Sequence, residues 1–149
     1  MSAAELEAAR RERQFVDTNV LVYAHDGSAG EKRDRAASLL ADLWGTRAGC
    51  LSLQVLQEFF VTVTRETRRL LSSADATARL VWYAEWIVHE PTRQDLISAV
   101  ALHHSLRVSF WDAMILQSAR QLGCAVLWTE DLSHGQLYGG VTARNPFLA

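Results

Sequence analysis

The sequence predicts an α/β fold in which a parallel sheet of short strands carries helices on both of its faces. Short apolar segments alternate along the chain with longer segments that have apolar residues at helical spacing. The clearest apolar segment, Cys124–Trp128, has no polar residue, which is typical of a strand buried on both faces. The chain has 149 residues, of which 49% are hydrophobic, and this fits one domain with one core.

The individual elements follow from this alternation. The expected strands are Gln14–Val16, Cys50–Leu51, Ile87–Val88, Cys124–Trp128 and Val141–Ala143, the last at an edge of the sheet. The expected helices are Asn19–Ala24 as a helical turn, Glu31–Trp44, Leu53 to about Thr67, Ala74 to about Glu85, Arg93–Leu106 and Phe110–Leu122. Residues 129–140 are expected to form a loop.

Capping residues mark the helix ends. Ser52, Ser73 and Ser109 stand where a hydroxyl can accept a hydrogen bond from the first turn. The segment Thr92-Arg93-Gln94-Asp95 has the form of a capping box with Asp in place of Glu, and Gly123 ends the last helix. The expected buried stripe of the helix after Ser52 is Leu53, Leu56, Phe60 and Val63.

Composition excludes several classes of protein. The net charge is −2, so no global basic field favours nucleic acid. The longest apolar runs are far shorter than the roughly 20 residues that a membrane span needs, and the charged N-terminus lacks the apolar stretch of a secretory signal. Cys50 and Cys124, both beside apolar residues, are expected to be buried thiols in a cytoplasmic protein that makes no membrane contact.

The common cofactor and nucleophile motifs are absent. The chain contains 14 arginines and a single lysine, Lys32, which does not follow the glycines of a P-loop. No GxGxxG, HExxH, CxxC or GxSxG is present. The functional residues must therefore be sought outside these motifs.

Acidic residues occur beside the expected strand ends. Asp17 follows the first strand, Glu58 lies in the second turn of the helix after the second, Asp112 opens the long fifth helix, and Asp131 follows the clearest strand. Each has a structural explanation by itself: Asp17 and Asp112 as capping residues, and Glu58 and Asp131 as solvated surface acids. Ligands of a parallel sheet bind outside the carboxyl ends of the strands, so the joint pattern predicts one site.

Clustered carboxylates predict a hard divalent cation. Like charges raise one another's pKa unless a cation neutralises them. A cluster of oxygen ligands without His or Cys favours Mg²⁺, with Mn²⁺ as a substitute, over zinc. Such a site supports phosphoryl transfer or phosphodiester hydrolysis by activated water.

The same residues carry a resemblance to a known family. The chain resembles PIN-domain nucleases, and in particular the VapC toxins of toxin–antitoxin pairs. The matching segments cover nearly all of the chain from Gln14 onward and are FVDTNVLVYA (15–24), SLQVLQEFF (52–60), SFWDAMILQSA (109–119), VLWTEDLSHG (126–135) and NPF (145–147).

The resemblance implies a three-layer α/β/α fold and a Mg²⁺-dependent endoribonuclease acting on RNA. The metal-binding and catalytic acids carry over to Asp17, Glu58, Asp112 and Asp131, and the supporting polar residues to Thr18, Asn19 and Thr129, with Asn19 bracing the first acid. Glu130 departs from the pattern, and the spacing after the strand favours its neighbour Asp131 as the acid that faces the metal. The resemblance also implies a homodimer and a small VapB-like antitoxin as partner. The antitoxin would bind in a groove of this chain that the region of Trp82, Tyr83 and Trp86 helps to form.

Residues 1–13 form a charged extension that family members usually lack, and residues 14–149 form the nuclease domain. Two alternatives remain within the fold: an RNA-processing nuclease without an antitoxin, and a catalytically inactive RNA-binding or scaffold module. Phosphoaspartate proteins are disfavoured, because they need a lysine late in the chain and none follows Lys32.

Overall fold

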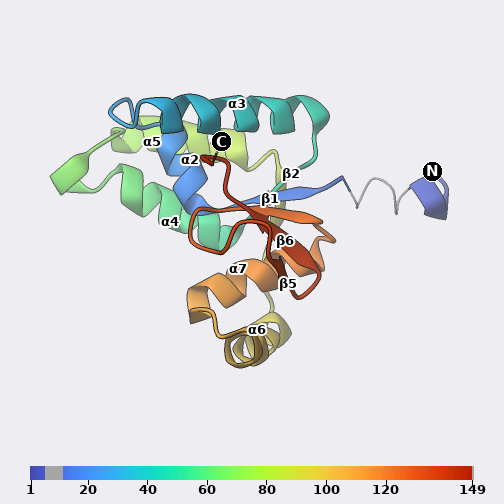
Figure 1. The fold of residues 1–149 in the computed structure, drawn as a ribbon. Helices are drawn as coiled ribbons and strands as arrows, with labels where there is room; N and C mark the ends of the chain where they lie inside the picture. The colour runs from blue at the N-terminus through green and yellow to red at the C-terminus, as the bar shows by residue number, and fades with distance from the viewer. Residues whose placement is uncertain (6–11, 149) are drawn as a thin grey trace.

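The computed structural model describes residues 1–5 and 12–148 and shows a six-stranded, mostly parallel sheet flanked by helices (Figure 1). The strands are β1 (Gln14–Val16), β2 (Gly49–Ser52), β3 (Ile87–His89), β4 (Val126–Trp128), β5 (Leu137–Tyr138) and β6 (Val141–Arg144). The helices are α2 (Thr18–Ala24), α3 (Glu31–Thr46), α4 (Leu53–Val63), η1 (Glu66–Arg68), α5 (Ser73–Tyr83), α6 (Arg93–Leu106) and α7 (Phe110–Gln121). The predicted α/β class is confirmed, whereas the prediction for residues 1–13 falls largely on residues 6–11, outside the described part.

The order of the strands determines where a site can form. The sheet runs β3-β2-β1-β4-β6-β5, and every pairing is parallel except that of β5 with β6. The chain therefore moves outward from β1 to β3 and then returns to β4 on the other side of β1. Ligands of open parallel sheets bind at such a switch point, which here lies beyond the carboxyl ends of β1 and β4.

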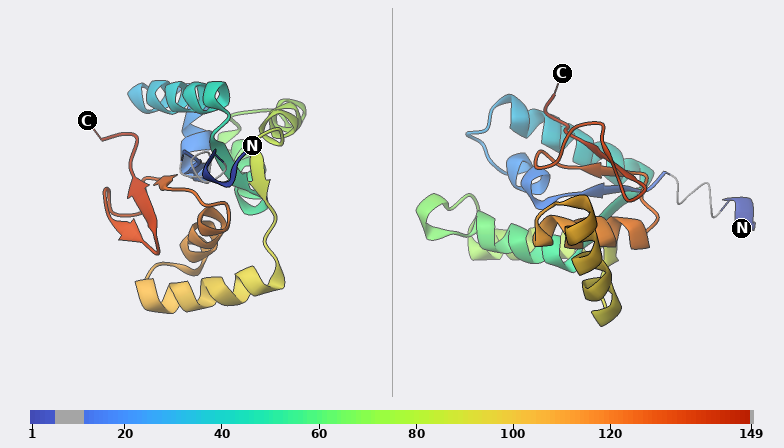
Figure 2. Two further views of the ribbon diagram at one scale, coloured as in Figure 1. Left: turned by 90° about the vertical axis from the view of Figure 1, so that its right-hand side faces the viewer. Right: turned by 60° about the horizontal axis from the view of Figure 1, so that its bottom comes forward.

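The helices form layers on the two faces of the sheet. Helix α3 lies on one face and α7 on the other, and α6 lies outside α7 (Figures 1 and 2). Residues Ala113 to Ala119 of α7 are all buried, because this helix is enclosed between the sheet and α6. The core side chains of β1, Phe15 and Val16, are fully buried in the middle of these layers. This packing holds the carboxyl ends of β1 and β4 and the first turn of α7 in fixed positions.

The capping residues act largely as predicted. Ser52 and Ser109 accept hydrogen bonds from the amides of Val55 and Asp112, and Thr92 with Asp95 forms a complete capping box. The cap of α5 is Ser72 rather than the predicted Ser73, one residue earlier.

Four predictions about the elements are wrong, two on α4 and two on the C-terminal strands. Helix α4 ends at Val63 rather than near Thr67, and its buried residues are Val55, Phe59 and Val63, whereas Leu53 is 43% exposed. The predicted stripe shares only Val63 with the buried face, because α4 is apolar around most of its circumference. The expected loop contains β5, which pairs with β6 across Gly139-Gly140, so β6 is interior and β5 is the edge strand.

The two cysteines are both buried and unpaired, as expected. Within residues 1–5 and 12–148, no helix is both long enough and apolar enough to span a membrane.

Candidate active site

Three aspartates from separate parts of the chain converge beyond the carboxyl ends of the strands. Asp17 follows β1, Asp131 lies three residues after β4, and Asp112 is in the first turn of α7. One carboxylate oxygen from each lies within 4.8 Å of the others. Because β1 and β4 are neighbours in the sheet, Asp17 and Asp131 lie together, and the packing of α7 on the sheet adds Asp112.

Asp17 is the most buried of the three, with 6% of its surface exposed. Its Oδ1 accepts a hydrogen bond from the backbone N–H of Thr18 (2.7 Å), and its Oδ2 accepts one from the hydroxyl of Thr129 (2.8 Å). Burial, together with the charges of Asp131 and Asp112, raises the pKa of Asp17 to about 7, although both hydrogen bonds act to lower it. A buried carboxylate of this kind favours a nearby positive charge.

Asp112 has its backbone amide in the cap of α7 and its carboxylate beside the other two aspartates. Its backbone N–H donates to the hydroxyl of Ser109 (3.1 Å), which caps α7. Partial burial raises the pKa of the Asp112 carboxyl, and the charges of Asp131 and Glu58 add to this rise. The capping role suggested by the sequence is therefore real for the backbone, but the side chain faces the other acids.

Glu58 lies beside this group of three and is not one of its members. Its Oε2 accepts a hydrogen bond from the hydroxyl of Thr18 (2.9 Å), and its Oε1 accepts one from the side-chain amide of Gln54 (2.8 Å). The same Thr18 thus bonds Asp17 through its amide and Glu58 through its hydroxyl. Glu58 lines the same cavity as the three aspartates.

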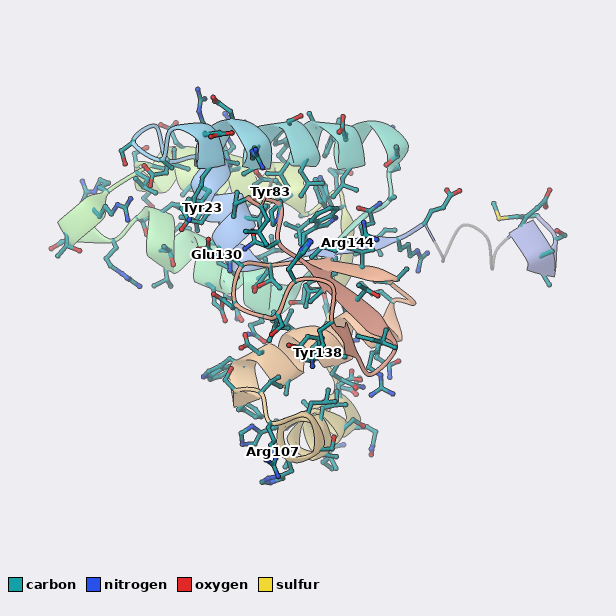
Figure 3. All side chains as sticks on the ribbon, viewed as in Figure 1. Tyr23, Tyr83, Arg107, Glu130, Tyr138 and Arg144 are labelled. Carbon is teal, nitrogen blue, oxygen red and sulfur yellow. The ribbon has the colours of Figure 1, made fainter. Side chains whose placement is uncertain are left out.

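The structure separates Glu130 from Asp131. Glu130 accepts a hydrogen bond from the hydroxyl of Tyr23 (2.7 Å) and forms an ion pair with Lys32 (3.0 Å). The side chains of Tyr23 and Glu130 lie together in Figure 3. Asp131 instead joins the cluster and accepts a hydrogen bond from the amide of Asn19 (3.0 Å). Asn19 therefore contacts Asp131, and not the first acid, Asp17, that the resemblance implied.

The cluster opens into a cavity of about 490 Å³. Among the residues that line it are two whose position the sequence did not indicate, Arg68 and Trp111. The side chain of Arg68 in η1 is 68% exposed and pairs with buried Asp26. No local pattern could have placed Arg68 there, but Trp111 directly precedes Asp112, which is a usable signal.

The sequence matches the PIN domain family over residues 15–139. The chain belongs to the PIN domain family. A search of curated proteins found no significant match.

The fold of this PIN domain is similar to that of two solved structures. DNA-bound VapBC from Salmonella typhimurium is 18% identical with a TM-score of 0.63, covering 90% of this chain and 98% of that chain. VapC20 from Mycobacterium tuberculosis, described as a toxin that cleaves the sarcin–ricin loop, is 19% identical with a TM-score of 0.58, covering 79% of this chain and 89% of that chain.

The donor set of this PIN domain fits a divalent cation. Three carboxylate oxygens close together, with no His or Cys among them, are the ligands that Mg²⁺ and Mn²⁺ prefer. Burial and the neighbouring acids raise the pKa values of Asp17 and Asp112, so a nearby positive charge would stabilise their ionised forms. A bound cation would supply that charge.

Proposed function

We propose that this chain is a metal-dependent endoribonuclease of the VapC toxin type. The observation that carries the proposal is the convergence of Asp17, Asp112 and Asp131 at the switch point of the sheet. A protein that only bound RNA would gain nothing from a cluster of negative charge facing phosphates, which disfavours the inactive binding module. The solved structures of similar fold, described as VapBC and as a VapC toxin that cleaves the sarcin–ricin loop, support this assignment.

In this proposal Asp17, Asp112 and Asp131 hold Mg²⁺, with Mn²⁺ as a substitute. Thr18 and Thr129 keep the two oxygens of Asp17 in fixed directions through their hydrogen bonds. Asn19 does the same for Asp131. Glu58, linked to Asp17 only through Thr18, acts through water or by positioning Thr18.

The reaction is hydrolysis of an RNA phosphodiester. When bound, the ion lowers the pKa of a water molecule and neutralises charge on the phosphate. The water oxygen forms a bond to phosphorus, the bond from phosphorus to one ester oxygen breaks, and the leaving oxygen is protonated. Asp17, Asp112, Thr18 and Thr129 lie at strand ends and helix starts, and Asp131 in the loop after β4 is bonded by Asn19, so the ligands are kept in position.

The proposal is tested by cleavage of a single-stranded RNA by the purified protein. We expect cleavage with Mg²⁺ or Mn²⁺ and none with EDTA. Asp17→Asn should abolish cleavage, whereas Asp131→Ala should be far more damaging than Glu130→Ala, since Glu130 pairs with Lys32 outside the cluster. Cleavage that persists in EDTA would exclude the metal mechanism.

The antitoxin would occupy a groove between α3 and α5. A cavity of about 280 Å³ there is lined mainly by apolar and aromatic side chains, including Leu40, Trp44, Trp82 and Trp86. Trp82 is 42% exposed and stacks on Trp44 with ring centroids 4.7 Å apart. An apolar helix from a small protein partner can bury such a surface.

A second apolar surface, on α4 and α5, would pair two copies of the chain. Leu53, Val61 and Val81 are 43%, 57% and 65% exposed and border one shallow apolar cavity. Val81→Asp should shift a dimer toward a monomer in light scattering without changing the melting temperature of the fold. A wild type that is monomeric both alone and with the product of the adjacent gene would contradict this assignment.

The toxin role has its own test, independent of the chemistry. Expression of the chain alone should arrest growth, and co-expression of the small adjacent open reading frame should restore it. A catalytically active protein that is harmless when expressed would instead be an RNA-processing nuclease without an antitoxin.

A further inference from the structure

Trp111 is the most exposed of the five tryptophans and the one that borders the acidic cavity. Its side chain is 62% exposed, whereas Trp44 and Trp82 stack on each other and Trp128 donates its indole N–H to Gln14 (2.6 Å). Trp86 packs edge-on against Tyr83, with ring centroids 5.9 Å apart. The other four thus have partners in the fold that account for their positions, and Trp111 has a large free aromatic face.

The position of Trp111 is fixed relative to the acids. It directly precedes Asp112 in the first turn of α7, and its backbone carbonyl accepts a hydrogen bond from Gln54 (3.5 Å), which also binds Glu58. On one side the ring meets Phe110 edge-on, with centroids 5.0 Å apart, and Phe110 packs against the core. The indole is therefore held at the border of the cavity.

The cavity also offers a partner for a phosphate. Arg68 is the positively charged side chain among the residues that line it. Its pairing with Asp26 uses one nitrogen of the guanidinium, so other N–H donors remain available at a largely exposed side chain. An aromatic face and a guanidinium on one cavity match the two parts of a nucleotide, its base and its phosphate.

We propose that Trp111 is a stacking platform for an unpaired base of the RNA, at a nucleotide next to the phosphodiester that is cleaved. This inference rests on the proposed function and adds to it a residue of this chain that contacts substrate. Stacking requires a base that is not paired in a helix, so Trp111 selects single strands and loops over duplex RNA. The stacked base places its neighbouring phosphate at the carboxylates.

The first test removes either the base or the platform. Once the cleavage site in a short single-stranded oligoribonucleotide is known, single nucleotides around it are replaced by abasic ones. We expect the wild type to lose about 10-fold in kcat/KM at one abasic position and Trp111→Ala to lose about 10-fold on the unmodified oligonucleotide. On the oligonucleotide that is abasic at that position, kcat/KM of Trp111→Ala should fall no further. On the unmodified oligonucleotide, Trp111→Phe should retain most of the activity.

A second test measures stacking without cleavage. In the Asp17→Asn background, binding of the unmodified oligonucleotide should quench the tryptophan fluorescence, because a base stacked on an indole quenches its emission. The quenching should disappear with Trp111→Phe while the affinity falls less than 3-fold. The matched control Trp82→Phe, which lies on another surface, should leave the quenching unchanged.

The outcomes separate this proposal from the one on which it rests. If RNA is cleaved but Trp111→Ala loses activity equally on unmodified and abasic oligonucleotides, the platform is wrong and the nuclease assignment stands. If Trp111→Ala instead converts a dimer into a monomer, with the same loss on every substrate, Trp111 belongs to a protein interface and the proposal is overturned. If RNA is bound with quenching and never cleaved, the platform is supported and the nuclease assignment fails.

Discussion

Helices α6 and α7 begin with the same sequence pattern, a hydroxyl residue followed three positions later by an aspartate. In both, the hydroxyl oxygen accepts a hydrogen bond from the backbone amide of that aspartate, at 3.2 Å for Thr92 and 3.1 Å for Ser109. The capping pattern by itself gives no reason to treat Asp95 and Asp112 differently.

Their carboxylates nevertheless have opposite surroundings. Asp95 accepts hydrogen bonds from the amide and hydroxyl of Thr92 (2.8 and 3.1 Å) and from Gln117 (3.1 Å), and His89 lies 3.3 Å away. These contacts, led by the Thr92 amide, lower its pKa. The carboxylate of Asp112 faces Asp17 and Asp131. Burial, followed by repulsion from Asp131 and Glu58, raises its pKa.

The difference lies in what the fold places beside each helix start. The first turn of α6 meets donors from β3 and α7, which satisfy the carboxylate of Asp95 and make it structural. The first turn of α7 meets the carboxyl ends of β1 and β4, where two further acids lie. Two aspartates in the same local pattern can thus differ: the carboxylate of Asp95 is stabilised by hydrogen-bond donors, whereas that of Asp112 lies among other acids. The second is the candidate for function.

The largest expected effect of this difference is on RNA cleavage. Asp112→Asn should reduce kcat by about 100-fold or more, because it removes a metal ligand at nearly constant shape. Asp95→Asn, the matched control, should stay within about 3-fold of the wild type when assayed well below its melting temperature. Equal losses in the two variants would show that Asp112 has only the structural role of Asp95.

The second effect is on stability, in the opposite sense. Asp95→Asn replaces one acceptor oxygen of a buried network by a donor, and we expect a loss of about 1–3 kcal/mol in the free energy of unfolding. Asp112→Asn removes one of several repelling charges and should leave the metal-free protein equally or more stable. Urea denaturation in EDTA measures both. A loss of ~1 kcal/mol in Asp112→Asn would mean that its carboxylate supports the cap of α7.

The third effect is on the response to metal. At about ten times Kd, binding to the folded state stabilises the wild type by roughly 1.4 kcal/mol, a rise of about 3–5 °C in melting temperature. Asp95→Asn should melt lower and keep the full rise, whereas Asp112→Asn should lose most of it. Thermal melts with and without Mg²⁺ check this prediction, and an intact rise in Asp112→Asn would remove Asp112 from the metal site.

Much of the fold could be predicted because its signals are local. The caps at Ser52, Thr92 and Ser109 each act within one helical turn, and all three start the predicted helix. The buried face of α4 was not predictable in this way, since apolar residues surround the helix and only its tertiary neighbours decide which are covered. Strand β5 was missed although Gly139-Gly140 between Leu137-Tyr138 and Val141-Thr142 is a recognised hairpin signal.

The site was predictable only as a set. The capping pattern does not distinguish Asp112 from Asp95, and the strand order that joins Asp17 to Asp131 is a property of the whole sheet. The relation of Glu58 to the cluster depends on the intervening hydroxyl of Thr18, and the partner of Asn19 depends on the path of the loop after β4. These are distances of a few ångströms between segments far apart in the chain, which residue spacing does not encode.

The smallest expected effect is a difference in the sign of the pH dependence. The pKa of Asp95 is lowered in the folded state, so its stabilisation is present above its unfolded pKa of about 3.9 and is lost as the pH falls through the folded value. The pKa of Asp112 is raised, so the folded state binds the proton more tightly, and the cost of its charge appears as the pH rises above about 3.9. As the pH rises from about 3 to 7, the wild type should therefore gain stability relative to Asp95→Asn and lose it relative to Asp112→Asn. Denaturation in EDTA at successive pH values measures both differences. If both changed in the same direction, the two carboxylates would have the same electrostatic role, and the contrast between the two helix starts would fail.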